Sequence, residues 1–273
     1  MSTTGRFVDV PGGSLRSETA GSGTPIVLVH GFSFDITTWD DQFAAFSSVH
    51  TVTRYDLRGF GRSSAPEGTY SHVDDLVQVL RQVNGAPAHI VGLSLGANVA
   101  LSLALLYPDM VRSLVLASSG LPGYAWTDER PPDAALAHAK RYGVQSAQAF
   151  WLAHPLFASV MDRPAVETKL RQVVGRYSGW HWDHENPMRP LEATRVRLAE
   201  VKAPVLVISG DLDVAGYRAI ARELADGIEG SHLVRFASAG HLVNMEEPQR
   251  FNEEVLAFIA SVEQRGRRSQ DGT

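Results

Sequence analysis

Short apolar runs recur along most of the chain, separated by clusters of glycine, proline and polar residues. Residues 26–30, 111–117 and 204–209 are almost entirely apolar and rich in β-branched side chains, which is typical of strands buried on both faces. In residues 71–83 the apolar positions instead recur three or four apart, which predicts an amphipathic helix. Strands that alternate with helices form a mostly parallel sheet with helices on both faces. The pattern therefore predicts an α/β fold.

The same pattern predicts the two ends of this sheet. Residues 7–10 and 15–19 are short strands joined by Pro11–Gly13, which is a hairpin signal. Residues 231–236 form the last strand, and a final amphipathic helix follows it. The apolar face of that helix carries Phe251, Val255, Phe258, Ile259 and Val262.

The alternation of strand and helix patterns is interrupted between residues 121 and 201. This segment has no convincing strand and several prolines, and its clearest helical pattern spans residues 165–177. We interpret residues 121–201 as a helical cap, or lid, inserted into a core domain made of residues 1–120 and 202–263. Residues 264–273 are polar, and we expect them to be a disordered tail.

Candidate chemistry begins at Gly92–Gly96, a G-x-S-x-G pattern between a predicted buried strand and a predicted helix. A serine at such a turn adopts strained backbone geometry that lifts its hydroxyl above the sheet edge, and its neighbours must be small. The alternative reading is an ordinary strand-to-helix turn with packing glycines. The strand–turn–helix context favours Ser94 as a nucleophile.

A serine nucleophile needs a base, and the base needs an acid that fixes its tautomer. His241 follows the last predicted strand, and Asp213 follows the strand before it, so both belong to the edge where the strands end. Asp211 is the alternative acid. We favour Asp213 because it lies further out in the loop, whereas Asp211 suits the capping of a turn.

These residues, together with His30–Phe32 and Asp56–Ser63, resemble the motifs of the α/β-hydrolase superfamily over nearly the whole chain. The order Ser94, Asp213, His241 is the order expected in that superfamily. The resemblance implies an eight-stranded sheet with a cap inserted after the sixth strand. It also implies an oxyanion hole formed by the backbone N–H groups of Phe32 and Leu95.

Within the superfamily, the chain is similar to small bacterial esterases, enol-lactonases and related carbon–carbon hydrolases. Many relatives have proline where this chain has Ser33, a residue that could bind substrate but is better suited to a turn. No aspartate occupies the elbow, which disfavours epoxide hydrolase and dehalogenase chemistry. The expected function is hydrolysis of a small ester-like substrate through an acyl-enzyme. A lactone or carbon–carbon hydrolase, a cofactor-free perhydrolase and a low-turnover binding protein stay as alternatives.

The substrate pocket is expected between the elbow and the cap. Candidate lining residues, besides Phe32, are Phe34, Ser118, Trp151, Trp180 and Leu242. Residues 181–185, with the sequence HWDHE, could suggest a metal site, but no distant partner has matching spacing and a solvated cap loop is the better interpretation. We therefore expect neither a metal nor a cofactor.

The composition of the chain limits its possible chemistry, partners and cellular location. The chain has 273 residues, a net charge of −5 and no cysteine, which excludes disulfides, zinc–thiolate sites and a cysteine nucleophile. No basic stripe is present, so nucleic acid and anionic membrane are not expected partners. No signal-like or transmembrane-length apolar run occurs, and a cytoplasmic protein is the default. The oligomeric state is not fixed by the sequence, and a homodimer is compatible with it.

Overall fold

The computed structural model describes residues 3–83, 85–127, 130–191 and 194–271. They contain one eight-stranded sheet with the strand order β1-β2-β4-β3-β5-β6-β7-β8. The first two strands form the predicted hairpin, β2 is antiparallel to β4, and all other neighbours are parallel. The strands are β1 (Thr4–Val10), β2 (Gly13–Ala20), β3 (Pro25–Val29), β4 (Thr51–Tyr55), β5 (Ala88–Leu93), β6 (Val111–Ala117), β7 (Val205–Gly210) and β8 (His232–Phe236). The predicted α/β fold is confirmed.

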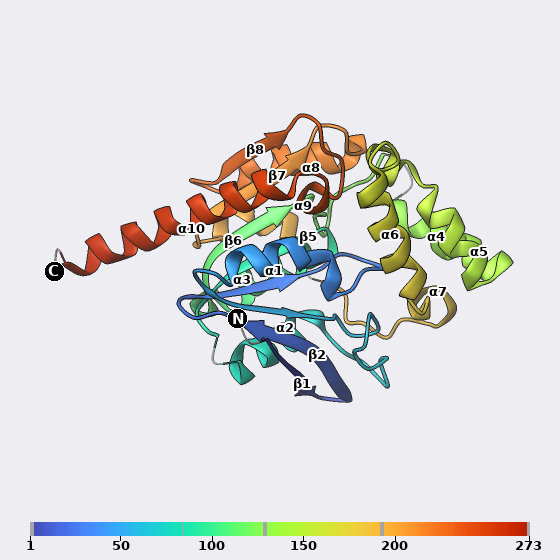
Figure 1. Cartoon of the computed structure of the whole chain (residues 1–273), viewed down its shortest axis with the longest axis horizontal. Helices are drawn as coiled ribbons and strands as arrows, with labels where there is room; N and C mark the ends of the chain where they lie inside the picture. Colours follow the sequence, from blue (N-terminus) through green and yellow to red (C-terminus); the bar gives the residue numbers. More distant parts are fainter. Residues whose placement is uncertain (1–2, 84, 128–129, 192–193, 272–273) are drawn as a thin grey trace.

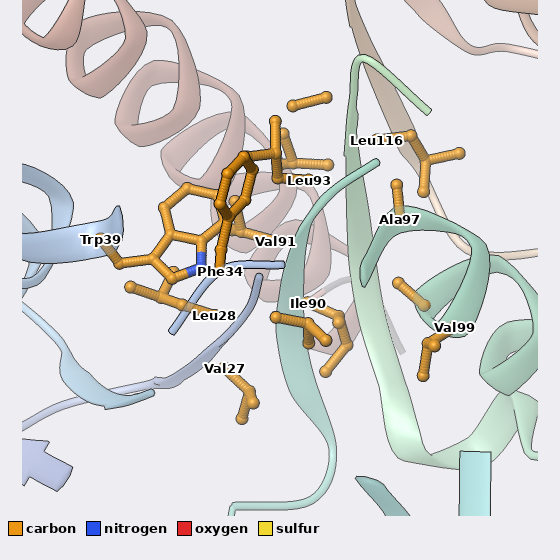
Figure 2. Close-up of a cluster of buried hydrophobic side chains, with 14 of the residues drawn as sticks. Val27, Leu28, Phe34, Trp39, Ile90, Val91, Leu93, Ala97, Val99 and Leu116 are labelled. Atoms are coloured by element: carbon orange, nitrogen blue, oxygen red, sulfur yellow. The ribbon is translucent and has the colours of Figure 1, made fainter. Parts of the chain in front are cut away.

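Helices pack on this sheet in two groups, in which α1 contacts α10 and α2 contacts α3. Side chains of β5 alternate between them: Val91 and Leu93 lie on the side of Trp39, whereas Ile90 points toward Val99 of α3 (Figure 2). Both sides of β5 are therefore buried, as its continuous apolar sequence predicts. The core helices are η1 (Ile36–Trp39), α1 (Asp40–Phe46), α2 (His72–Gln82), α3 (Leu95–Leu106), η2 (Pro108–Met110), α8 (Ala215–Gly227), α9 (Val243–Glu246) and α10 (Pro248–Asp271).

Between β6 and β7 the described residues form helices and loops, which we call the helical insertion (residues 121–201). Its longer helices gather beyond one end of the sheet (Figure 1), and its residues line cavities at the carboxyl end of β5. The elements are α4 (Pro131–Tyr142), α5 (Val144–Leu152), η3 (Pro155–Val160), α6 (Pro164–Arg176), α7 (Trp180–Asp183) and η4 (Thr194–Glu200).

The end of the chain differs from the expectation of a disordered tail from residue 264. Helix α10 continues to Asp271 and projects away from the sheet (Figure 1). A polar composition shows only that this segment contributes no side chains to the hydrophobic core. Its glutamine and arginines are good helix formers, and Arg267 lies 3.7 Å from Glu263, one turn away. None of the described helices is long and apolar enough to cross a membrane.

Candidate active site

Ser94 stands at the sharp turn between β5 and α3. Its backbone has φ 53° and ψ −111°, outside the helical and strand regions. The flanking glycines make this turn possible: a Cβ on Gly92 would lie 2.5 Å from the carbonyl oxygen of Gly96, and one on Gly96 would lie 2.0 Å from that of Val29. The side chain of Ser94 borders two cavities. The geometry is that of a nucleophile elbow.

Two backbone amides are available beside this serine. Leu95 is the first residue of α3, so its N–H group has no carbonyl within the helix to bind. The loop after β3 approaches from the other side, because a Cβ on Gly31 would lie 3.4 Å from the Cβ of Ser94. Phe32 follows in that loop and lines the same two cavities as Ser94. The two residues expected to form an oxyanion hole therefore flank Ser94.

His241 and Asp213 come together from the loops after β8 and β7. The Nδ1 atom of His241 lies 2.8 Å from Oδ2 of Asp213, and both side chains are buried. Asp213 also accepts a hydrogen bond from the amide of Val214 at 2.7 Å. Asp211 points elsewhere and binds Nε of Arg235 at 2.8 Å. Asp213 is thus the acid that orients His241 in this structure, and Asp211 is not.

A buried carboxylate that the sequence analysis did not single out for the site shapes the His241 loop. Oε2 and Oε1 of Glu246 accept hydrogen bonds from the amides of Gly240 and Leu242, at 2.9 and 3.1 Å. Arg163, in the helical insertion, donates to the carbonyl oxygen of Glu246 at 2.5 Å. The amides on both sides of His241 are therefore held by the side chain of Glu246, and the backbone of the same residue is linked to the insertion.

Tyr217 is a second residue that sequence reasoning missed. Its ring lies 4.3 Å from that of His241, between ring centres, and Tyr217 lines both of the cavities that Ser94 borders. Burial and the charge of Asp213 raise the pKa of the Tyr217 hydroxyl, so it stays protonated. The available signal was its place four residues after Asp213, in the first turns of the following helix.

The helical insertion is tied to the loop after β3 by two polar contacts. Nε1 of Trp151 donates to Oγ of Ser33 at 2.8 Å, and both side chains are buried. Arg176 binds Oδ2 of Asp35 at 2.8 Å. Ser33 therefore anchors the insertion beside Phe32. Its φ of 63° also fits a turn position.

Two cavities meet at Ser94. One has a volume of about 450 Å³ and is lined by Leu95, Asn98, Leu121, Arg130, His181 and Leu191, among others. The other has a volume of about 10 Å³ and includes His241, Phe34 and Trp151. Phe34 and Trp151 thus lie where the sequence predicted. Of the described residues lining these cavities, none is Ser118, Trp180 or Leu242.

Each of these three residues has another position. Ser118 is buried at the end of β6, and its amide donates to the carbonyl oxygen of Ile208 at 2.9 Å. Trp180 stacks on His184 with ring centres 5.1 Å apart. Leu242 is fully buried behind His241. Their positions in the sequence predicted the correct edge of the sheet for these residues. They did not predict which way each side chain points.

His181 was expected in a solvated loop, but it is buried and stacks on Phe60 at 4.3 Å. Its Nδ1 atom lies 2.9 Å from the hydroxyl of Tyr177. Burial lowers the pKa of His181 to about 3 and that of His72, which lines the same large cavity, well below its ordinary value. Both imidazoles are therefore neutral at pH 7. Among the described residues no group of His, Asp and Glu has the arrangement of a metal site.

The model of the family described as "Alpha/beta hydrolase family" matches residues 26–254. The chain belongs to this family. The match includes all the parallel strands and the residues gathered at Ser94.

Relatives within the family carry several activities. The chain is 30% identical to the 2-hydroxy-6-oxononadienedioate/2-hydroxy-6-oxononatrienedioate hydrolase of Burkholderia vietnamiensis, over 94% of this chain and 96% of that one. It is 28% identical to the enol-lactonase of Burkholderia xenovorans, with a TM-score of 0.78 over 93% of this chain and 100% of that one. The same values apply to Est816, described as an N-acyl homoserine lactone degrading enzyme. These similarities support hydrolase activity.

Proposed function

We propose that this protein is a serine hydrolase that cleaves carboxylic esters or related activated carbonyl compounds through an acyl-enzyme. One observation carries the proposal. Ser94, in its strained turn, shares a cavity with His241, whose Nδ1 atom is 2.8 Å from buried Asp213. Because Nδ1 is engaged by the carboxylate, Nε2 is the ring nitrogen available to take a proton from Ser94.

In the proposed reaction, Oγ of Ser94 attacks the carbonyl carbon while His241 accepts its proton. The amides of Phe32 and Leu95 bind the oxyanion, and a single donor of this kind is typically worth about 10²–10³ in kcat. His241 then protonates the leaving oxygen as the carbon–oxygen bond breaks. In the second half, His241 takes a proton from water, the water oxygen bonds to the acyl carbon, and the proton returns to Oγ.

The charges of the large cavity favour an uncharged acyl group. Among its described lining residues Arg130 is the one charged side chain, and Arg130 is already paired with Asp133 at 2.5 Å. A dianionic substrate such as the nonadienedioate named for one relative would need cationic partners of its own. An ester is therefore favoured over that carbon–carbon cleavage. The lactonases among the relatives make a lactone the second candidate.

The proposal is tested by labelling with a fluorophosphonate and by hydrolysis of methyl esters in a pH-stat. We expect the label on Ser94 by peptide mass spectrometry, and loss of both labelling and turnover in Ser94→Ala. Removing such a nucleophile costs on the order of 10⁶ in kcat. Ser102→Ala, at a buried serine of α3, is the matched control and should keep both.

Other outcomes would contradict the proposal in specific ways. Turnover that survives in Ser94→Ala would exclude the serine mechanism. Labelling of Ser94 without hydrolysis of any ester or lactone would indicate a ligand-binding protein. A reaction faster with hydrogen peroxide than with water, detected by a halogenation assay, would indicate a perhydrolase.

A further inference from the structure

The two cavities at Ser94 differ greatly in size. Their volumes are about 450 and about 10 Å³. They share the lining residues Phe32, Ser94, Pro132 and Tyr217, so Ser94 lies where the two cavities meet. A substrate bound with its carbonyl carbon at Ser94 can extend from there into either cavity.

The smaller cavity is the one that contains His241. Its other walls are apolar, and Phe34, Leu156 and Phe157 are all buried. Trp151 completes them and is fixed by its hydrogen bond to Ser33 at 2.8 Å. Ring contacts join these walls, with Trp151 and Phe157 centred 5.2 Å apart. The compartment is thus enclosed by packed side chains from both the core and the helical insertion.

The chemistry of the proposed function assigns a role to each compartment. His241 must protonate the leaving oxygen and later activate water, so both oxygens occupy the side of the carbonyl that His241 faces. A volume of about 10 Å³ is close to the minimum of roughly 10–15 Å³ that holds one water molecule. The hydrolytic water fits there, whereas a large alcohol would have to displace buried aromatic rings.

The larger cavity has the properties of an acyl site. It includes Leu95, whose amide is one of the two proposed oxyanion donors, and Asn98 one turn further along α3. His72 and His181 contribute imidazoles that burial keeps neutral. The one charged residue of its described lining, Arg130, is paired with Asp133, so an uncharged acyl chain would not have to take water away from an unpaired charge.

We infer that the enzyme acts on esters of small alcohols with larger, uncharged acids, the acyl group lying in the large cavity and the alcohol beside His241. The inference rests on the proposed function and adds the orientation of the ester, namely which cavity holds the acyl group and which holds the alcohol. Net hydrolysis consumes one water and releases a carboxylic acid and a small alcohol, for which methanol is the model.

Pairs of isomeric esters test this inference on the wild-type protein. Methyl phenylacetate and benzyl acetate have the same composition but exchange the large and small partners, as do methyl hexanoate and pentyl acetate. Each kcat/KM is divided by the rate constant for hydroxide-catalysed hydrolysis, which removes intrinsic reactivity. We expect the methyl ester of each pair to be favoured by about tenfold or more, the discrimination that a pocket typically achieves for even one methylene.

Two variants locate the source of the preference. Leu156→Ala enlarges only the small compartment and should raise the relative rate with benzyl acetate by about tenfold. Leu170→Ala removes the same atoms from a buried leucine of α6 that lines neither cavity, and it should leave the preference between the two isomers unchanged. Because the isomer pairs are measured on the wild type, the test does not depend on either variant folding.

The outcomes separate this inference from the proposed function. Ser94-dependent hydrolysis with equal rates for both isomers, or faster hydrolysis of benzyl and pentyl acetates, would overturn the inference and leave the serine mechanism standing. Absence of Ser94-dependent hydrolysis for all four esters would overturn both. A methyl-ester preference that disappears in Leu156→Ala but not in Leu170→Ala would support the assignment of the compartments.

Discussion

The edge of the sheet and the helical insertion contribute to the same site but are held by different interactions. At the sheet edge, Ser94 is fixed by its backbone turn, and the loop of His241 is fixed by amide bonds to Glu246. The insertion reaches the site with aromatic side chains such as Trp151 and His181, which pack against rings of the core. Hydrogen bonds to backbone set atomic positions narrowly, whereas ring packing sets volume and shape. In the proposed function, the first region carries out the chemistry and the second limits which substrates fit.

After loss of the nucleophile itself, the largest effect should come from the acid at the sheet edge. Asp213→Asn is expected to lower kcat by about 10⁴, because an amide cannot hold the required tautomer of His241. Asp211→Asn is the matched control: Asp211 pairs with Arg235, whose side chain is 59% exposed, and such pairs contribute little. Steady-state kinetics on a methyl ester would measure both. Equal losses would mean that the two loops were assigned wrongly.

Acid should destabilise both regions through buried histidines. Burial lowers the pKa of His89, in strand β5, to about 4 and that of His181, in the insertion, to about 3. Below about pH 6.5 the unfolded chain binds protons that the folded chain does not. The contribution of these neutral histidines to the free energy of unfolding should therefore be fully present above about pH 6.5. It should be lost as the pH is lowered toward 4 for His89 and toward 3 for His181.

Urea titrations at several pH values would measure this dependence. Far-UV circular dichroism follows the whole chain, and tryptophan fluorescence follows chiefly the insertion, which holds four of the five tryptophans. In His181→Gln, the number of protons taken up on unfolding at acidic pH should be smaller by about one. If the slope is unchanged in His181→Gln, the stability of the insertion is not linked to this imidazole.

The contact that joins the two regions comes next. Ser33→Ala leaves the buried indole N–H of Trp151 without its acceptor, which should cost about 1–3 kcal/mol in the free energy of unfolding. Arg176→Ala breaks the second link, but that side chain is 49% exposed, so the cost should be at most about 1 kcal/mol. Urea denaturation measures both, and the reverse ranking would contradict the importance given to the buried contact.

The smallest effect concerns Tyr217. Tyr217→Phe keeps the ring against His241 but removes a hydroxyl from the cavities at Ser94. A hydrogen bond from this hydroxyl to Ser94 during the reaction is worth about 1 kcal/mol, so kcat should fall by up to about tenfold while KM changes little. A rise in KM with unchanged kcat would show instead that the hydroxyl contacts the substrate and not Ser94.

The sequence alone determined the elements whose constraints are local. The strands follow from continuous apolar runs, and the turn at Ser94 follows from Gly92 and Gly96, because no larger residue fits within that five-residue segment. The chain order of Ser94, Asp213 and His241 placed these residues at one edge, since parallel strands all end there. These predictions needed no knowledge of which distant residues touch.

Only the tertiary structure decided the contacts between segments far apart in the sequence. Trp151 meets Ser33 across 118 positions, and Tyr217 lines the cavities at Ser94 from the other half of the chain. The burial of His181 and the outward position of Trp180 are likewise invisible in a helical segment that is aromatic throughout. Periodicity gives the buried face of an element, but only packing against its neighbours decides which buried side chain reaches a cavity.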